Sequence, residues 1–430
     1  MAEYRIKEVL TKKDLMRFIK FPDALYKGCE QYVPALHMGQ AKTLMHSAAL
    51  AHCERKMWIV EDGRNVVGRI CGIINRRYNE RYGTRRTRFG WFDTINDIEV
   101  ARLLIETAAE WAAEKGMDEI HGPLQYNTFG RQGMLVDGFD KVAPFSCLYN
   151  YPYYNELMEQ LGFEKECDWI QYRMAADQGI PEKMRNISQR LMERYKLRIA
   201  DFDKMKKDPE NFRKFFKAYN ESFDGVVYNF IPFTDAEVEE EIGEISGQLD
   251  KRLCCVLLDE EDEVAAFGIA TPWMSEAMKK AKGRLFPFGW YHILKAKNNF
   301  NTIDLMLNGA APKWQQTGIS AWHSWWSVTT VSTPREAAWA ISAWAVIPVS
   351  TVMISFVPFS ASLSRAFITT STASSGVIFS LGAHAHKTAQ SMQATSKSAK
   401  HLFMIKSSFY ISTFFIKIYA IIICYPPQNF

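Results

Sequence analysis

Apolar and polar residues alternate with the two-residue period of β-strands in several runs of the first half of the chain. Two long runs, at residues 57–61 and 66–75, are separated by a short loop that contains Gly63, and this arrangement predicts a β-hairpin. Residues 4–9 predict a strand before the hairpin. Further strands are expected after it, at residues 89–92, 119–122 and 169–174.

Helical periodicity appears between these strands. Residues 97–116 form an amphipathic pattern, and residues 153–161 predict a second helix. Near the start, Thr11 can cap a helix over residues 12–19. We expect that helix to end before Pro22, because a residue that precedes proline avoids the helical conformation. The order of elements predicts helices packed around a mixed sheet.

The second half repeats this order. A hairpin is predicted at residues 253–258 and 264–271, followed by helices at 274–282 and 288–295. The helix expected at residues 208–223 carries four aromatic residues at helical spacing, which favours a place in the core. These residues are Phe212, Phe215, Phe216 and Tyr219. The predicted fold class is therefore α+β, with two mixed-sheet domains of similar architecture in tandem.

Residues 301–320 predict a strand that ends in an anion-binding turn. Apolar positions alternate up to Leu307, and Pro312 stops the strand because it cannot donate a hydrogen bond. A polar turn with one glycine, Gly318, follows. If a helix begins there, its first amides are unpaired and its dipole favours an anion such as a phosphate.

This segment resembles the acyl-CoA binding motif of the GNAT acetyltransferase superfamily, Gln/Arg-x-x-Gly-x-Gly/Ala, here Gln315-x-x-Gly318-x-Ser320. The resemblance implies that acetyl-CoA or another acyl-CoA is the cofactor. It implies that the loop amides hold the pyrophosphate and that the preceding strand bonds the pantetheine arm. The cofactor-binding residues expected on this basis are Leu307, Asn308, Gln315, Gln316, Thr317, Gly318, Ile319 and Ser320.

A longer pattern resembles an uncharacterised bacterial family with two GNAT-like halves. It includes the segments FPDALYKG, VVGRICGIINRRYNE, RFGWFD, GRQGMLVDGF and AKGRLFPFGWYHILKA. The similarity extends to about residue 321, which predicts domains at residues 1–176 and 177–321. In the first half the corresponding turn, residues 93–96, has no glycine and carries Asp93, so we expect a degenerate domain without a coenzyme A loop.

The resemblance implies N-acyl transfer from acyl-CoA to a small-molecule or peptide amine. Such a reaction needs a base for the ammonium and an acid for the departing thiolate. Three acids are possible bases: Glu237, Glu239 and Asp304. Asp304 is preferred because it lies on the strand before the turn. The two glutamates belong to an acidic helix at residues 237–248 that we expect to be solvated. Tyr228 is the candidate acid.

The composition changes abruptly after the motif. None of the 48 acidic residues lies beyond Glu336, while the residues up to that point carry slightly more acidic than basic groups. Residues 322–430 are therefore expected to form an acid-free, irregular tail that leaves the second domain truncated. Three explanations remain open: a membrane anchor through residues 337–364 and 409–425, an interaction extension, or a shifted reading frame. The position of the break, inside the helix that should follow the phosphate loop, favours the shifted frame.

Composition also limits the other classes of function. The basic residues show no clustered face of the kind that nucleic-acid binding requires, and the eight cysteines form no C-x-x-C or other metal-ligand spacing. The first residues, MAEYRIKEVL, contain no apolar signal core, so a cytoplasmic protein is expected. The sequence predicts a GNAT-like N-acyltransferase. The alternative is a non-catalytic binding module of the same fold whose hydrophobic extension docks at a membrane or partner.

Overall fold

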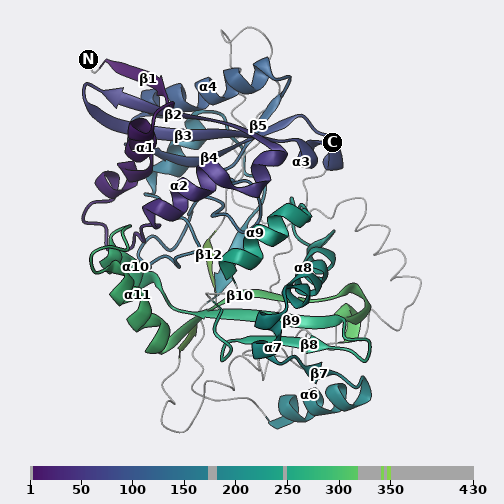
Figure 1. The fold of residues 1–430 in the computed structure, drawn as a ribbon. Coiled ribbons are helices and arrows are strands. Elements are labelled where there is room, and N and C mark those ends of the chain that lie inside the picture. Colours follow the sequence, from purple (N-terminus) through teal and green to yellow (C-terminus); the bar gives the residue numbers. More distant parts are fainter. Residues whose placement is uncertain (1–2, 173–181, 246–248, 318–339, 343–345, 350–430) are drawn as a thin grey trace, which may run out of the picture.

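The computed structural model describes residues 3–172, 182–245, 249–317, 340–342 and 346–349. Figure 1 shows two sheets, one from each half of the chain, with helix α9 (Asp235–Ile245) between them. Each sheet has five strands. This is the α+β architecture with two mixed sheets that the sequence predicts.

The first sheet has the strand order β1-β2-β3-β4-β5. Its neighbours are antiparallel except for β4 and β5, which run parallel. The strands are β1 (Tyr4–Glu8), β2 (Cys53–Asp62), β3 (Asn65–Asn75), β4 (Arg86–Thr94) and β5 (Glu119–His121). The helices of this half are α1 (Lys12–Leu25), α2 (His37–His46), α3 (Arg76–Tyr82), α4 (Ile98–Glu114) and α5 (Tyr153–Gln160), with the 3₁₀ helix η1 (Ala48–Ala51).

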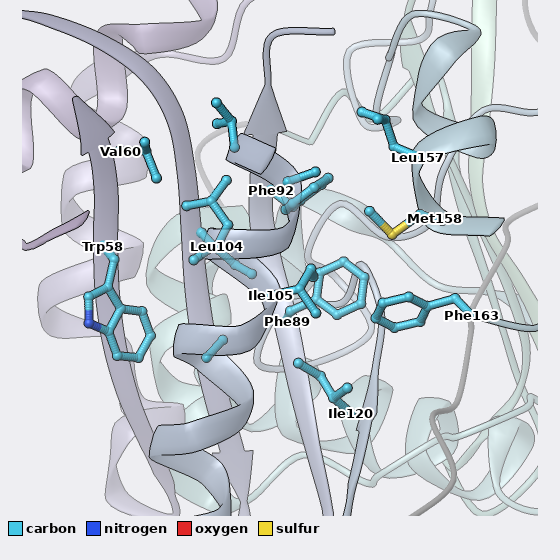
Figure 2. Close-up of a cluster of buried hydrophobic side chains, with 14 of the residues drawn as sticks. Trp58, Val60, Phe89, Phe92, Leu104, Ile105, Ile120, Leu157, Met158 and Phe163 are labelled. Atoms are coloured by element: carbon cyan, nitrogen blue, oxygen red, sulfur yellow. The ribbon is translucent and has the colours of Figure 1, made fainter. Parts of the chain in front are cut away.

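The core of the first half lies between the sheet and helix α4. Figure 2 shows Ile105 of α4 beside Phe89 of β4. Leu104 packs on β3, where a Cβ added at Gly68 would lie 2.8 Å from its Cδ1. The ring of Phe89 also makes an edge contact with Phe163, at 5.7 Å between centroids. Edge contacts of this kind add to the stabilisation that burial of apolar area provides.

Helix α1 does not end before Pro22, as the sequence predicted, but continues to Leu25. Proline in a helix removes one backbone donor and leaves the carbonyl four residues earlier without its helical partner. Here that carbonyl belongs to Phe18, and the buried side chain of Arg69 donates to it from Nη1 at 2.9 Å. A tertiary hydrogen bond therefore satisfies the group that the proline leaves open.

The second sheet has the strand order β11-β10-β9-β8-β7. It repeats the first, because only β10 and β11 run parallel. The strands are β7 (Arg198–Ile199), β8 (Cys254–Leu258), β9 (Val264–Pro272), β10 (Thr302–Ala310) and β11 (Ala340–Ser342). Besides α9, its helices are α6 (Glu182–Arg194), α7 (Phe202–Lys207), α8 (Pro209–Phe223), α10 (Ser275–Ala281) and α11 (Gly289–Asn298), with the 3₁₀ helix η2 (Pro312–Thr317).

The aromatic face predicted for the helix at residues 208–223 is in the core. Phe215 and Phe216 of α8 are buried, and Phe215 lies 4.9 Å from Phe267 of β9, measured between ring centroids. Phe129 reaches this cluster from the first half and contacts Tyr219 at 5.3 Å. The two halves therefore share part of one apolar core.

Few residues of the predicted tail are described. They form β11 and a second short strand, β12 (Val346–Val349), which pairs antiparallel with β6 (Trp169–Tyr172). The membrane segments considered at residues 337–364 and 409–425 otherwise lie outside the described residues, so the choice between the three explanations stays a prediction. Within the described ranges, every helix is too short or too polar to cross a bilayer.

Candidate functional site

The parallel strand pair of each half provides a matched position at which a ligand could lie beside the sheet. In the first half β5 pairs with only the first three residues of β4, from Arg86 to Arg88. In the second half β11 pairs with only the first three residues of β10, from Thr302 to Asp304. Beyond these pairs the edges of β4 and β10 meet different surroundings.

The edge of β4 is covered by the chain that follows β5. Leu124 donates its backbone N–H to the carbonyl of Phe89 at 2.7 Å. The approach is so close that a Cβ added at Gly90 would lie 2.2 Å from the carbonyl oxygen of Leu124. Every residue of β4 after Arg86 is buried. No room for a pantetheine arm remains along this strand.

The end of β4, where it enters the turn, carries an anion of the protein itself. The carboxylate of Asp93 accepts from the Arg69 guanidinium at 2.7 Å and from the Tyr26 hydroxyl at 3.0 Å. The Tyr154 hydroxyl also donates to this carboxylate, at 3.4 Å, and its oxygen accepts from the backbone N–H of Thr94 at 3.1 Å. The amide that follows, on Ile95, donates to Val67. The amides next to this turn are therefore engaged within the protein.

The edge of β10 is more exposed. Among the described residues its pairing with β11 ends at Asp304, and an irregularity in its pairing with β9 follows between Leu305 and Leu307. Residues 305–309 are partly or fully exposed, with Asn308 the most exposed of them. Of these two matched strands, β10 is therefore the more exposed.

The turn after β10 begins as η2, three residues earlier than the predicted polar turn at Gln315. Trp314 is buried there, and its backbone N–H donates to Ala311 at 2.7 Å. The Gln315 side chain donates to the carbonyls of Ser222 and Ala310, both at 3.2 Å, so it ties the turn to helix α8.

The predicted cofactor residues are divided by the limits of the described structure. Leu307 and Asn308 lie on the edge strand, and Gln315, Gln316 and Thr317 lie in η2. Gly318, Ile319 and Ser320 lie outside the described residues. The role of this set in binding a cofactor therefore stays a prediction.

Tyr228, the predicted acid, lies in a polar cluster where the two halves meet. Its hydroxyl donates to Oε1 of Glu166, which also accepts from Arg86 Nη1 at 2.6 Å. Burial and the neighbouring Glu166 carboxylate raise the pKa of Tyr228, so the phenol stays protonated through neutral pH. The adjacent Val227 packs against the same large apolar cluster as Leu307 of β10.

His121 completes this cluster. Its ring is fully buried, and burial lowers its pKa to about 4, so the imidazole is neutral at pH 7. Its Nδ1 lies 3.8 Å from Glu166 Oε2, longer than a hydrogen bond. Burial opposes ionisation of Glu166, but His121 and Arg86 outweigh it and lower its pKa to about 2.

Several buried polar atoms of this cluster have no hydrogen-bond partner among the described residues. They are both ring nitrogens of His121, Oε2 of Glu166, Nε of Arg88 and Nδ2 of Asn229. Buried polar groups in proteins are nearly always bonded. The arrangement therefore has spare donors and acceptors that a polar ligand or water could use.

Asp304, the predicted base, is buried on β10, just before the exposed part of the strand. The pKa of the Cys147 thiol is raised mainly by burial of Cys147 and also by the charge of Asp304. Strand β6 contacts the surroundings of both Asp304 and Tyr228. Gln171 of β6 donates to Cys147 at 2.5 Å, while Trp169 packs in the same apolar cluster as Tyr228. Residues two apart in a strand share one face and lie about 7 Å apart. One face of β6 therefore runs between the neighbourhoods of the predicted acid and base.

The other two possible bases have structural roles. Glu237 is buried rather than solvated, because its carboxylate accepts from the N–H and hydroxyl of Thr234, both at 2.9 Å, in a capping box at the start of α9. The prediction of a solvated face was wrong at this residue, and the Thr-x-x-Glu spacing could have shown it. Glu239 is exposed and pairs with Arg213 at 2.6 Å.

Glu166 and His121 were not identified from the sequence. Glu166 lies in the polar run EKECD, which looks like an exposed loop, and His121 is a single histidine at the end of a short strand. No spacing relates either residue to Tyr228. The signal is tertiary, because three separate segments supply the three side chains.

Comparisons with known proteins give distant relatives. No protein-family model matches the chain. Protein YghO of Escherichia coli is 27% identical over 293 residues, covering 67% of this chain and 73% of that protein. A bacterial ceramide synthase of Caulobacter vibrioides is 26% identical over 300 residues, covering 68% of this chain and 76% of that protein.

Solved structures of GNAT proteins also align with the chain. A GCN5-related glucosamine N-acetyltransferase region of a fungal multi-domain β-N-acetylglucosaminidase aligns with 83% of this chain and 38% of that chain, with 13% identity and a TM-score of 0.49. A tandem GNAT protein from the clavulanic acid biosynthesis pathway aligns with 83% of this chain and 98% of that chain, with 9% identity and a TM-score of 0.46. These solved structures are of proteins from the superfamily that the sequence motifs resemble.

Proposed function

We propose that this chain is an acyltransferase that moves an acyl group from acyl-CoA to an amine, with the cofactor held by the second half only. The observation that carries the proposal is the exposed edge of β10 after Asp304, where the matched edge of β4 is covered. A pantetheine arm can bond a strand edge of this kind, since such an edge presents backbone donors and acceptors. The two halves would correspond to the domains predicted at residues 1–176 and 177–321.

In this reaction the amine nitrogen bonds to the thioester carbonyl carbon and the carbon–sulfur bond breaks. The amine loses a proton to a base, and the coenzyme A thiolate takes one from an acid. Tyr228 is suited to the acid role, because its raised pKa keeps it protonated and Glu166 orients its hydroxyl. Asp304, on β10, remains the proposed base.

The name of one relative, a bacterial ceramide synthase, supports amide formation as the reaction class, because a ceramide is the N-acyl derivative of a long-chain amino alcohol. An amine acceptor is therefore proposed for this chain as well, without a choice of acyl length.

The experiment is a thiol-release assay with acetyl-CoA or a longer acyl-CoA and a panel of amines, small-molecule and amphiphilic. We expect amine-dependent thiol release, and Tyr228→Phe should lower kcat by about 100-fold or more with little change in KM, as loss of a general acid does. Tyr82→Phe is the matched control, because that hydroxyl also bonds across the junction, to the Phe230 carbonyl at 2.9 Å. Equal rates for Tyr228→Phe and the wild type would remove Tyr228 from the chemistry, and no release with any amine would oppose the transferase proposal.

A further inference from the structure

Large apolar side chains gather on one exposed face of the second half. Twelve such side chains are strongly exposed in the described part of the chain, and five of them lie within nine consecutive residues around the start of α11. Figure 1 shows α10 and α11 together at one side of the molecule, below α2. The five residues are Phe286, Phe288, Trp290, Tyr291 and Leu294, which we call the aromatic face.

The aromatic face is held in place from behind. Gly289 of α11 packs so closely on the preceding loop that an added Cβ would lie 1.8 Å from the carbonyl oxygen of Arg284. Ile293 packs inward against the apolar cluster that contains Met278. The backbone N–H of His37 donates to the Gly283 carbonyl at 2.9 Å and fixes the loop to the first half. The exposed rings are therefore presented on an anchored support.

The exposed surface of this face is mainly apolar, because the indole N–H of Trp290 is hydrogen-bonded within the protein. Trp290 donates its indole N–H to the Pro287 carbonyl at 2.9 Å, within the same loop. Phe286 and Phe288 are the most exposed of the set, at 75% and 71%. Exposed apolar side chains grouped in this way mark an interaction site rather than ordinary surface.

Positive charge surrounds the aromatic face. Between Ser275 and Asn298 the chain has six basic residues and one acid, Glu276, which lies 3.5 Å from Lys279. Lys280, Lys282 and Arg284 line a groove between α10–α11 and the end of α1, which adds Lys27. The acid in this groove is Asp23, and it is paired with His37 at 2.8 Å. The face is thus both apolar and net positive.

We propose that the aromatic face docks on the surface of an anionic lipid bilayer. Aromatic and leucine side chains insert at the boundary between headgroups and acyl chains, and flanking Lys and Arg residues are attracted to anionic headgroups. Charge complementarity favours a bilayer over an uncharged apolar partner. Docking of this kind does not require the proposed transfer reaction, and it differs from anchoring by the tail because it uses residues before the change in composition.

The test is co-sedimentation of the full chain with vesicles of phosphatidylcholine alone or mixed with phosphatidylglycerol in equal parts. We expect binding to the anionic vesicles that weakens as salt is added. Phe286→Ser/Phe288→Ser should weaken it at least about tenfold, because two apolar anchors are lost. Lys280→Glu/Lys282→Glu should weaken binding to the anionic vesicles and leave any binding to neutral vesicles unchanged.

Matched controls separate this face from general exposure and charge. Leu10→Ser removes an apolar side chain that is 78% exposed elsewhere, and Lys204→Glu/Lys207→Glu reverses two exposed lysines of α7. Both should bind vesicles as the wild type does. Every variant keeps the residues after 321, so a loss of binding reports on the aromatic face. Thiol release from soluble acyl-CoA should be unchanged in the Phe286→Ser/Phe288→Ser variant, which separates docking from the transfer reaction.

Two results would overturn the proposal. One is a wild-type chain that does not sediment with the anionic vesicles. The other is a Phe286→Ser/Phe288→Ser variant with an unchanged unfolding midpoint that binds as well as the Leu10→Ser control. Self-association that disappears in the same variant, without vesicle binding, would show that a second copy of the chain covers this face.

Discussion

The two halves of the molecule use the same parallel strand pair in opposite ways. In the first half the edge of β4 is covered and its turn holds the carboxylate of Asp93. In the second half the matched edge of β10 is partly exposed beyond Asp304. If the second half holds an anionic cofactor as proposed, the first half closes the matched position with an anion and a backbone partner of its own, while the surrounding sheet is kept.

The largest difference between the halves should appear in stability, at matched positions. Phe89 is the fourth residue of β4 and Leu305 the fourth of β10, but Phe89 is fully buried and Leu305 only partly. Phe89→Ala should lower the free energy of unfolding by about 3–5 kcal/mol, and Leu305→Ala by roughly 1 kcal/mol. Urea unfolding of both variants measures this. Equal losses would show that the edge of β10 is as closely packed as that of β4.

The second prediction concerns the internal anion of the first half. Asp93→Ala leaves the buried Arg69 guanidinium without its partner and should lower the free energy of unfolding by about 3–5 kcal/mol. The control is Asp97→Ala, which removes the cap of α4 and the acceptor of the Tyr4 hydroxyl and should cost about 1–2 kcal/mol. If coenzyme A stabilised Asp93→Ala more than the wild type, the turn of the first half would be a suppressed cofactor site.

The third prediction uses the polar cluster that joins the halves. The folded pKa of His121 is about 4, below its ordinary value of 6.5, so the unfolded chain binds more protons and stability falls as pH drops from 6.5 to 4. The folded pKa of Glu166 is about 2, below 4.5, so its contribution is present above pH 4.5 and is lost as pH falls toward 2.

Substitutions in the cluster should separate these two ranges. In the wild type the urea midpoint should fall as the pH drops through both ranges. Glu166→Gln should make the midpoint less dependent on pH between 4.5 and 2. His121→Phe should make it less dependent on pH between 6.5 and 4. An acid response that is unchanged in both variants would mean that the cluster does not couple to folding.

The smaller elements show what the sequence can and cannot specify. The hairpin of β2 and β3 follows from local alternation, and the buried aromatic side chains of α8 follow from helical spacing. Both lie where they were predicted. Helix α1 passes Pro22 because Arg69, forty-seven residues later in the chain, bonds the open carbonyl. Such a contact has no local signal.

The candidate site divides in the same way. Asp304 was named from its place on the strand before the motif, and Tyr228 was named as the candidate acid. The structure buries Asp304 and bonds Tyr228 to Glu166. The contribution of Glu166 and His121 depends on burial and on three segments meeting at one point, which a single sequence does not encode as spacing. The sequence also did not predict that the edge of β4 is covered. The absence of a glycine from the turn after β4 predicted only that this turn is not a coenzyme A loop.

Titration calorimetry with coenzyme A tests the central claim most directly, in the wild type and in two matched turn variants. Gly318→Val alters the turn predicted from the sequence of the second half, and Asn96→Val alters the exposed turn of the first. We predict that the wild type and Asn96→Val bind equally and that Gly318→Val binds at least about tenfold more weakly. No binding to the wild type at millimolar coenzyme A, or an equal loss in Asn96→Val, would contradict a cofactor site confined to the second half.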